Sequence, residues 1–170
     1  MKIVGMVLCV FSTSLIGLFY SGKLYERYGL LRQIEDMVTL IKNEIEYNRA
    51  GISEVSFYVS NKTTGKLKNM LLELSERTKE NIGILEDIWC ECVRKHLSNT
   101  SLNKNDISEL CRLGKNMGYL GFEMQKVNFS NYLSLISKEI CYTKENLEKT
   151  AKFYRLMGLM SGIGISILFI

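Results

Sequence analysis

The chain begins and ends with an apolar segment that carries no charged side chain, and this feature limits its fold most strongly. The first segment runs from Ile3 to Gly22 and the second from Leu156 to Ile170. A helix rises about 1.5 Å per residue, so a run of this first length covers the roughly 30 Å of a bilayer core. We therefore expect transmembrane helices at residues 1–22 and 156–170.

Each apolar segment has an alternative interpretation. The first could be a cleaved signal peptide, but only Met1 and Lys2 precede it and no A-x-A-like cleavage site follows it. The second reaches only about 22 Å as a helix, so a buried core helix is its alternative. Amphipathic side chains before it, among them Lys152 and Arg155, would extend it toward the lipid headgroups.

Basic residues flank the inner ends of both apolar segments. They are Lys23, Arg27, Arg32, Lys149, Lys152 and Arg155. Only Lys2 lies beyond either segment. Because an excess of lysine and arginine stays on the cytoplasmic side, we expect residues 23–155 to form a cytoplasmic domain with both termini across the membrane.

The hydrophobic pattern of this domain is helical. One series with 3-4 spacing consists of Leu31, Ile34, Val38, Ile41 and Ile45. A similar series consists of Phe129, Leu133, Ile136, Ile140 and Leu147, with Thr143 at a weak position. Such spacing predicts two long helices that pack along neighbours, and the absence of proline from the whole chain favours the same class. Both would leave the same membrane face, so they should run antiparallel.

Regular breaks divide the segment between these long helices. We expect shorter helices near residues 52–60, 66–77, 84–97 and 106–117, although Val55 to Val59 is also compatible with a strand. Asp106, with Glu109 three residues later, predicts the N-cap of the last one. The predicted fold is all-α, a cytoplasmic bundle of about six helices whose long terminal helices continue into the two transmembrane helices.

Small residues recur on one face of each predicted membrane helix. The first stripe consists of Gly5, Cys9, Thr13 and Gly17, and the second of Gly158 and Gly162. Small stripes let helix backbones approach closely. The two segments could therefore pack on each other or on the membrane helices of a partner.

The composition argues against several functional classes. The 22 basic and 18 acidic residues are spread evenly, which excludes a nucleic-acid-binding tract. Five cysteines, an odd number without a repeated C-x-x-C, are read as small buried side chains in a reducing compartment. Trp89 is interpreted as a core or interface residue.

Catalytic motifs are also missing from the sequence. The single histidine, His96, is too few for a histidine-based metal site or a paired nucleophile. The closest approach to a phosphate loop, around Lys66, has Ser60 in place of the leading glycine and Leu67 in place of the final serine or threonine. Glu44 and Glu46 lie two apart on a helix and face different sides. We expect no enzyme activity, cofactor, metal or small-molecule substrate.

Several segments, in their order and spacing, resemble the stage III sporulation protein AB family over nearly the whole chain. They are Tyr25-Glu26-Arg27, Leu31-Arg32-Gln33-Ile34, Leu40, Glu44-Ile45-Glu46-Tyr47 and the glycine-containing segment Leu113 to Gly118. Two departures are present: the proline usual after Tyr47 is missing around Gly51-Ile52, and Met117 replaces a leucine.

This resemblance implies a non-enzymatic scaffold in the channel complex that joins mother cell and forespore in endospore-forming bacteria. It places the chain in the mother-cell membrane around the forespore, with other membrane subunits and a cytoplasmic hexameric ATPase as partners. The domain would be similar to the helical domains of type II secretion and type IV pilus platform proteins. A platform subunit outside sporulation and a membrane-bound small-ligand sensor are the alternatives.

Six residues are predicted to contact partners: Arg27, Arg32, Glu44, Tyr47, Gly114 and Gly118. Glu44 and Tyr47 lie three apart and should share a helix face. A glycine inside a helix costs about 1 kcal/mol relative to alanine, which is hard to explain for Gly114 unless close approach requires it. Anchoring at lipid headgroups is an alternative role for Arg27.

Overall fold

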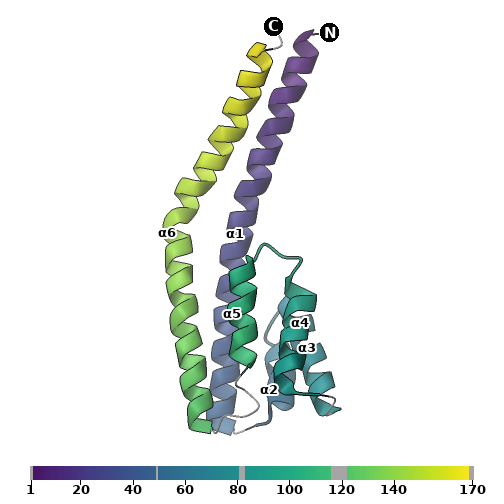
Figure 1. The fold of residues 1–170 in the computed structure, drawn as a ribbon, viewed down its shortest axis with the longest axis vertical. Helices are drawn as coiled ribbons and strands as arrows, with labels where there is room; N and C mark the ends of the chain where they lie inside the picture. The colour runs from purple at the N-terminus through teal and green to yellow at the C-terminus, as the bar shows by residue number, and fades with distance from the viewer. Residues whose placement is uncertain (1, 49, 81–82, 116–121, 169–170) are drawn as a thin grey trace. The chain divides into compact units, whose positions relative to one another are not determined.

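The computed structural model describes residues 2–48, 50–80, 83–115 and 122–168, and throughout these ranges every regular element is an α-helix. The helices are α1 (Lys2–Asn48), α2 (Ile52–Ser60), α3 (Gly65–Lys79), α4 (Leu85–Leu97), α5 (Lys104–Gly114) and α6 (Phe122–Leu168) (Figure 1). The prediction of an all-α chain with six helices is confirmed for this part of the chain.

The short helices lie close to their predicted positions, and the largest differences are at the two ends of α5, which begins two residues earlier and ends three residues earlier than predicted. The prediction that Asp106 is the N-cap is wrong, because Asn103 occupies that position. The Asn103 side-chain oxygen accepts a hydrogen bond from the Asp106 backbone N–H at 2.7 Å, and the Asp106 carboxylate accepts one from the Asn103 N–H at 2.9 Å. Asp106 is thus the third helical residue of a reciprocal capping box.

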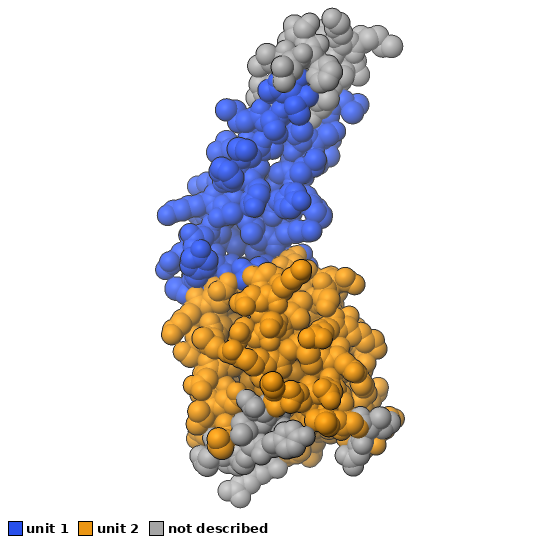
Figure 2. All heavy atoms as spheres, in the orientation of Figure 1, with its two compact units in different colours: residues 1–29, 141–170 blue, residues 30–140 orange. Residues whose placement is uncertain are grey.

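The chain forms two compact units, coloured separately in Figure 2. Unit 1 consists of residues 1–29 and 141–170, and unit 2 of residues 30–140. Helix α1 contributes residues to both units, and so does helix α6. The predicted limits of the membrane segments, after residue 22 and before residue 156, stay predictions.

Unit 2 has a closely packed core. Helix α2 packs against α3, α3 against α4, and α4 against α5. The predicted α1 series is confirmed, since all five of its residues are buried: Leu31, Ile34, Val38, Ile41 and Ile45. These helices form because their apolar residues recur on one side and exchange water for the shared core.

The predicted series on α6 is confirmed only in part. Phe129, Ile136 and Ile140 are buried, but Leu133 is half-buried and Tyr132, one residue earlier, is buried in its place. A tyrosine at the third position after Phe129 fits the helical period as well as a leucine at the fourth. The sequence pattern favoured the aliphatic residue and missed the aromatic one.

In unit 1, α1 and α6 run antiparallel and meet through glycines. A Cβ atom built on Gly17 would lie 2.7 Å from the backbone oxygen of Tyr154, and one on Gly158 would lie 2.7 Å from that of Thr13. A Cβ on Gly162 would lie 2.4 Å from the Thr13 hydroxyl oxygen. These small residues therefore lie where the two segments meet in unit 1, and packing on the membrane helices of a partner stays a prediction. The surroundings of Gly5 and of the Cys9 side chain are not described.

The prediction that the ends of α1 and α6 cross a membrane is not confirmed. Over the residues that the structure describes, no helix combines the length and the mean hydropathy required to cross a bilayer. The transmembrane helices predicted at residues 1–22 and 156–170 therefore stay predictions.

Candidate interaction surfaces

A polar hollow lies where α1 ends and α2 begins. It has a volume of about 480 Å³, and its lining includes the carboxylates of Glu44 and Glu54, the amide of Asn48 and the ring of Tyr58. The Asn48 amide donates a hydrogen bond to Glu44 Oε2 at 2.5 Å. Tyr47, in the last turn of α1, is 85% exposed. Of the two residues predicted to share a helix face, Glu44 thus lines an anionic hollow and Tyr47 has an exposed aromatic ring. We call Glu44, Tyr47, Glu54 and Tyr58 the α1–α2 surface.

A lysine side chain of the chain itself contacts this surface. The Lys62 ammonium donates a hydrogen bond to the Tyr58 hydroxyl and lies 4.2 Å from the centre of the same ring. A cation over an aromatic face is stabilised by the ring quadrupole. This local pair indicates that the α1–α2 surface accommodates positively charged groups.

The two predicted arginines have different environments. In unit 1, Arg27 donates a hydrogen bond from Nη1 to the Thr143 hydroxyl at 3.3 Å, which joins α1 to α6. In unit 2, 56% of the Arg32 side chain is exposed, and its Nη1 lies 3.6 Å from Glu35 Oε2. Arg32 is therefore accessible to a partner, whereas Arg27 has a role inside its own unit.

Gly114 is buried against Trp89, so close approach inside unit 2 explains this glycine, and its predicted contact with a partner stays a prediction. A Cβ at this position would lie 2.1 Å from Cδ1 and 2.3 Å from Cγ of the indole. The ring is fully buried, and its Nε1 donates a hydrogen bond to the Leu110 backbone oxygen at 2.8 Å. Gly114 thus holds α5 against α4. Gly118 lies outside the described residues.

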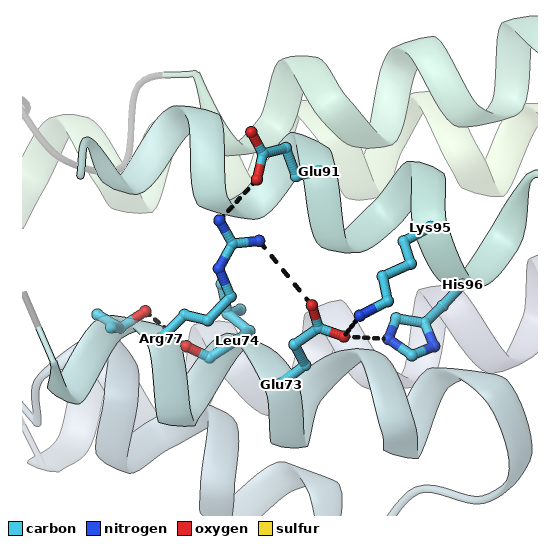
Figure 3. A network of polar contacts seen from close by, with 7 residues as sticks. Glu73, Leu74, Arg77, Glu91, Lys95 and His96 are labelled. Carbon is cyan, nitrogen blue, oxygen red and sulfur yellow. Dashed lines mark hydrogen bonds and ion pairs between the residues drawn. The ribbon is translucent and has the colours of Figure 1, made fainter. Parts of the chain in front are cut away.

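A network of charged side chains joins α3 to α4 and is centred on Glu73 (Figure 3). Glu73 Oε2 accepts a hydrogen bond from Lys95 at 2.7 Å and lies 2.8 Å from His96 Nε2. Arg77 lies 3.9 Å from Glu73 Oε1 and 2.6 Å from Glu91. The Lys95 hydrogen bond, followed by the one from His96, lowers the pKa of Glu73 against the opposing effect of burial. The network connects two helices, and His96 belongs to it.

A second cavity lies inside unit 2 between α1, α5 and α6. It has a volume of about 230 Å³. Its polar lining consists of Asn105, Asp106, Glu109, Arg112, Tyr132 and Glu139. Burial, and then the charges of Asp106 and Glu109, raise the pKa of Tyr132, so the phenol stays protonated. The series on α6 predicted an apolar face here. Tyr132, at the third position after Phe129, was the only indication of a polar group on that face.

The cysteines are less uniformly buried than predicted. Cys92 is buried, Cys90 and Cys111 are half-buried, and Cys141 is exposed. The Cys111 thiol approaches the Cys90 backbone oxygen at 3.8 Å. Burial raises the pKa of Cys111 to about 12, so this thiol is protonated and unreactive near neutral pH.

The residues nearest to catalytic motifs have structural contacts. Lys66, next to the incomplete phosphate loop, donates a hydrogen bond to the Asn99 backbone oxygen at 2.7 Å. Gly65 before it has a φ of +63°, a backbone conformation that favours glycine and explains its place at the start of α3. Among the described residues, no group of three or more histidine, cysteine or acidic side chains is arranged to hold a metal ion.

Comparison with known proteins identifies the family. The family model for stage III sporulation protein AB matches residues 2–170. A solved structure of "Stage III sporulation protein AB (SpoIIIAB)" is similar, with a TM-score of 0.67 and 16% sequence identity, over 72% of this chain and 96% of that one. No curated protein matches the sequence. The structural likeness shows a shared fold, and the match over nearly the full length shows that this chain belongs to the stage III sporulation protein AB family.

Proposed function

We propose that this chain is a non-enzymatic scaffold, anchored in the mother-cell membrane, in the channel complex between mother cell and forespore. Membership of the family supports a role in sporulation. Within that role, the proposed partners are other membrane subunits of the complex and a cytoplasmic hexameric ATPase. Unit 1 would be the anchor and unit 2 the part that contacts the ATPase.

The observation that carries the proposal is the apolar exterior of unit 1. Its large hydrophobic side chains that are more than half exposed include Leu8, Phe11, Ile16, Phe19, Leu156 and Met160. The contact between α1 and α6 is made through glycines, so these larger side chains lie outside it. Contiguous exposed apolar surface marks a membrane or protein interface. Lipid, together with helices of other membrane subunits, would cover it.

Unit 2 supports the docking half of the proposal through the α1–α2 surface. Glu44 and Glu54 place two carboxylates in one hollow, and Tyr47, which precedes the lining residue Asn48 in the sequence, has an exposed ring. Aromatic residues are enriched at protein interfaces, and charge complementarity guides the encounter. The proposed ATPase contact is therefore a basic surface with an apolar or aromatic centre.

The anchor is tested by topology. A reporter that is active only in the cytoplasm should work when inserted near Asn99, an exposed residue after α4, and fail when fused after Ile170. Reporter activity at both positions would contradict a second membrane crossing. Release of the intact chain from membranes by high salt alone would contradict anchoring by lipid.

Docking is tested by reversing charge on the α1–α2 surface. Glu44→Lys and Tyr47→Ala should each reduce co-purification with the ATPase and leave the melting temperature unchanged. Glu76→Lys on α3, also an exposed carboxylate, is the matched control and should retain the partner. Full retention by both surface variants, or early unfolding of both, would disprove docking at this surface.

The absence of catalysis is tested with nucleotide. The purified chain should neither bind nor hydrolyse ATP. A turnover that disappears in Lys66→Ala would contradict the scaffold role, because Lys66 is the basic residue of the incomplete phosphate loop.

A further inference from the structure

The cavity between α1, α5 and α6 is lined by a hydroxyl group whose hydrogen-bonding capacity is unused. Tyr132 is only 7% exposed and lines the cavity, and the described residues provide no hydrogen bond to its hydroxyl. Glu109 Oε2 is also buried without a hydrogen bond. Its contact is the Arg112 guanidinium, at 2.8 Å but outside hydrogen-bonding direction. Glu109 Oε2 thus has a charged partner. The Tyr132 hydroxyl has none among the described residues, and because a polar group without a partner is costly, it indicates a missing donor.

The charge of the lining selects the sign of that group. Asp106, Glu109 and Glu139 contribute three carboxylates, against the single guanidinium of Arg112. Arg112 lies largely in solvent, with 62% of its side chain exposed, whereas Glu109 is 32% exposed and Asp106 is buried. The inner part of the cavity is therefore more negative than its rim. A positively charged donor would satisfy the phenol oxygen and would be attracted by the carboxylates of the lining.

The apolar lining and the size select the shape of that group. Leu31, Ile34 and Ile136 are buried walls, and Leu135 is 46% exposed at the edge. Cavities for small-molecule ligands usually begin at roughly 300 Å³. The volume of about 230 Å³ instead suits one long side chain. Arginine and lysine have this combination, an aliphatic stem that packs on apolar walls and a charged end.

We propose that this cavity receives an arginine or lysine side chain of a partner protein, with its charged end between Glu109, Asp106 and the Tyr132 hydroxyl and its stem along Ile34 and Ile136. The scaffold role supplies only the source of this side chain. The chemistry of the cavity is independent of that role and can be tested without the complex.

The experiment titrates the full chain, in nonionic detergent and labelled at the isoleucine δ1 methyl groups, with N-acetyl-arginine methylamide. The neutral N-acetyl-citrulline methylamide, of nearly the same shape, is the matched probe. Saturable shifts of the Ile34 and Ile136 signals are expected with the arginine probe. The signal of Ile88, buried on α4, should not move. Citrulline should bind about tenfold more weakly or not at all.

Variants assign the binding to the named groups. Glu109→Gln and Tyr132→Phe should each weaken the arginine probe about tenfold with unchanged melting curves, whereas Glu76→Gln should bind like the parent. Equal shifts with citrulline, or unchanged binding in Glu109→Gln, would overturn the cation site. A free polyamine such as putrescine that binds more tightly than the arginine probe would overturn a partner side chain as the occupant. These results do not depend on the ATPase, so failure here leaves the docking experiment intact.

Discussion

The contact between Gly114 and Trp89 predicts a large effect of the smallest possible substitution. In Gly114→Ala the new methyl would lie 2.1 Å from Cδ1, 2.3 Å from Cγ and 2.9 Å from Cβ of the indole. All three atoms belong to one buried side chain, so either the ring or α5 must move. Overpacking of this kind costs about 1–3 kcal/mol.

The indole cannot move freely, because its Nε1 donates a hydrogen bond to the Leu110 backbone oxygen. Loss of that hydrogen bond would add about 1 kcal/mol, and the better helix propensity of alanine returns up to about 1 kcal/mol. We therefore expect a net destabilisation of about 2 kcal/mol. For a chain of this length it corresponds to a melting temperature lower by about 4–8 °C.

Fluorescence is the direct assay, since Trp89 is the only tryptophan in the sequence. Thermal and urea unfolding should both report the loss. Gly29→Ala is the matched control, because a Cβ there meets nothing within 4 Å, and it should be neutral or slightly stabilising. An unchanged melting curve and emission spectrum in Gly114→Ala would refute the packing role.

Three further predictions follow from described contacts. Asn103→Ala removes the capping box of α5 and should cost about 1 kcal/mol in urea unfolding, whereas Asn99→Ala in the preceding loop should not; equal stability of the two would contradict the capping role. Glu73→Gln should lower stability by about 1 kcal/mol at neutral pH. The Lys95 hydrogen bond lowers the pKa of Glu73 in the folded chain. The contribution of Glu73 to stability is therefore present above its unfolded pKa and disappears as pH falls through its folded pKa. A difference in stability between the parent and Glu73→Gln that persists in acid would contradict this explanation. Gly158→Ala should loosen the α1–α6 contact in unit 1 and speed its proteolysis, whereas Gly164→Ala, whose Cβ meets nothing within 4 Å, should not; equal cleavage rates would count against the close contact.

The helices were predictable because apolar side chains recur every three or four residues in each long series. Leu31 to Ile45 is such a series, and its burial follows from periodicity alone. The place of Gly114 was not predictable, because the reason for that glycine is Trp89, which lies on another helix. Asn103 was missed because an asparagine followed by aspartate is a weaker signal than aspartate followed by glutamate.

The candidate sites divide in the same way. Exposure of Tyr47 agrees with its place at the end of a helix, where the apolar series has finished. The cavity around Tyr132 combines residues from α1, α5 and α6, and no local pattern reports such a combination. Gly17, Gly158 and Gly162 were found because close helix contact requires small residues at fixed spacing, which is a local signal.

The spacing of the small residues on α1 and α6 also determines which registers of these two helices allow close contact in unit 1. A slide of one turn that brings Gly162 opposite Gly17 would bring Gly158 opposite Ser21 and Ser166 opposite Thr13, so every contact would again involve small residues. A slide the other way would bring the ring of Tyr154 against Gly17, where there is no room even for a methyl group. The small residues therefore restrict the register at which α1 and α6 meet in unit 1, and the hydrogen bond from Arg155 to Ser21, at 3.1 Å, stabilises the register that is present.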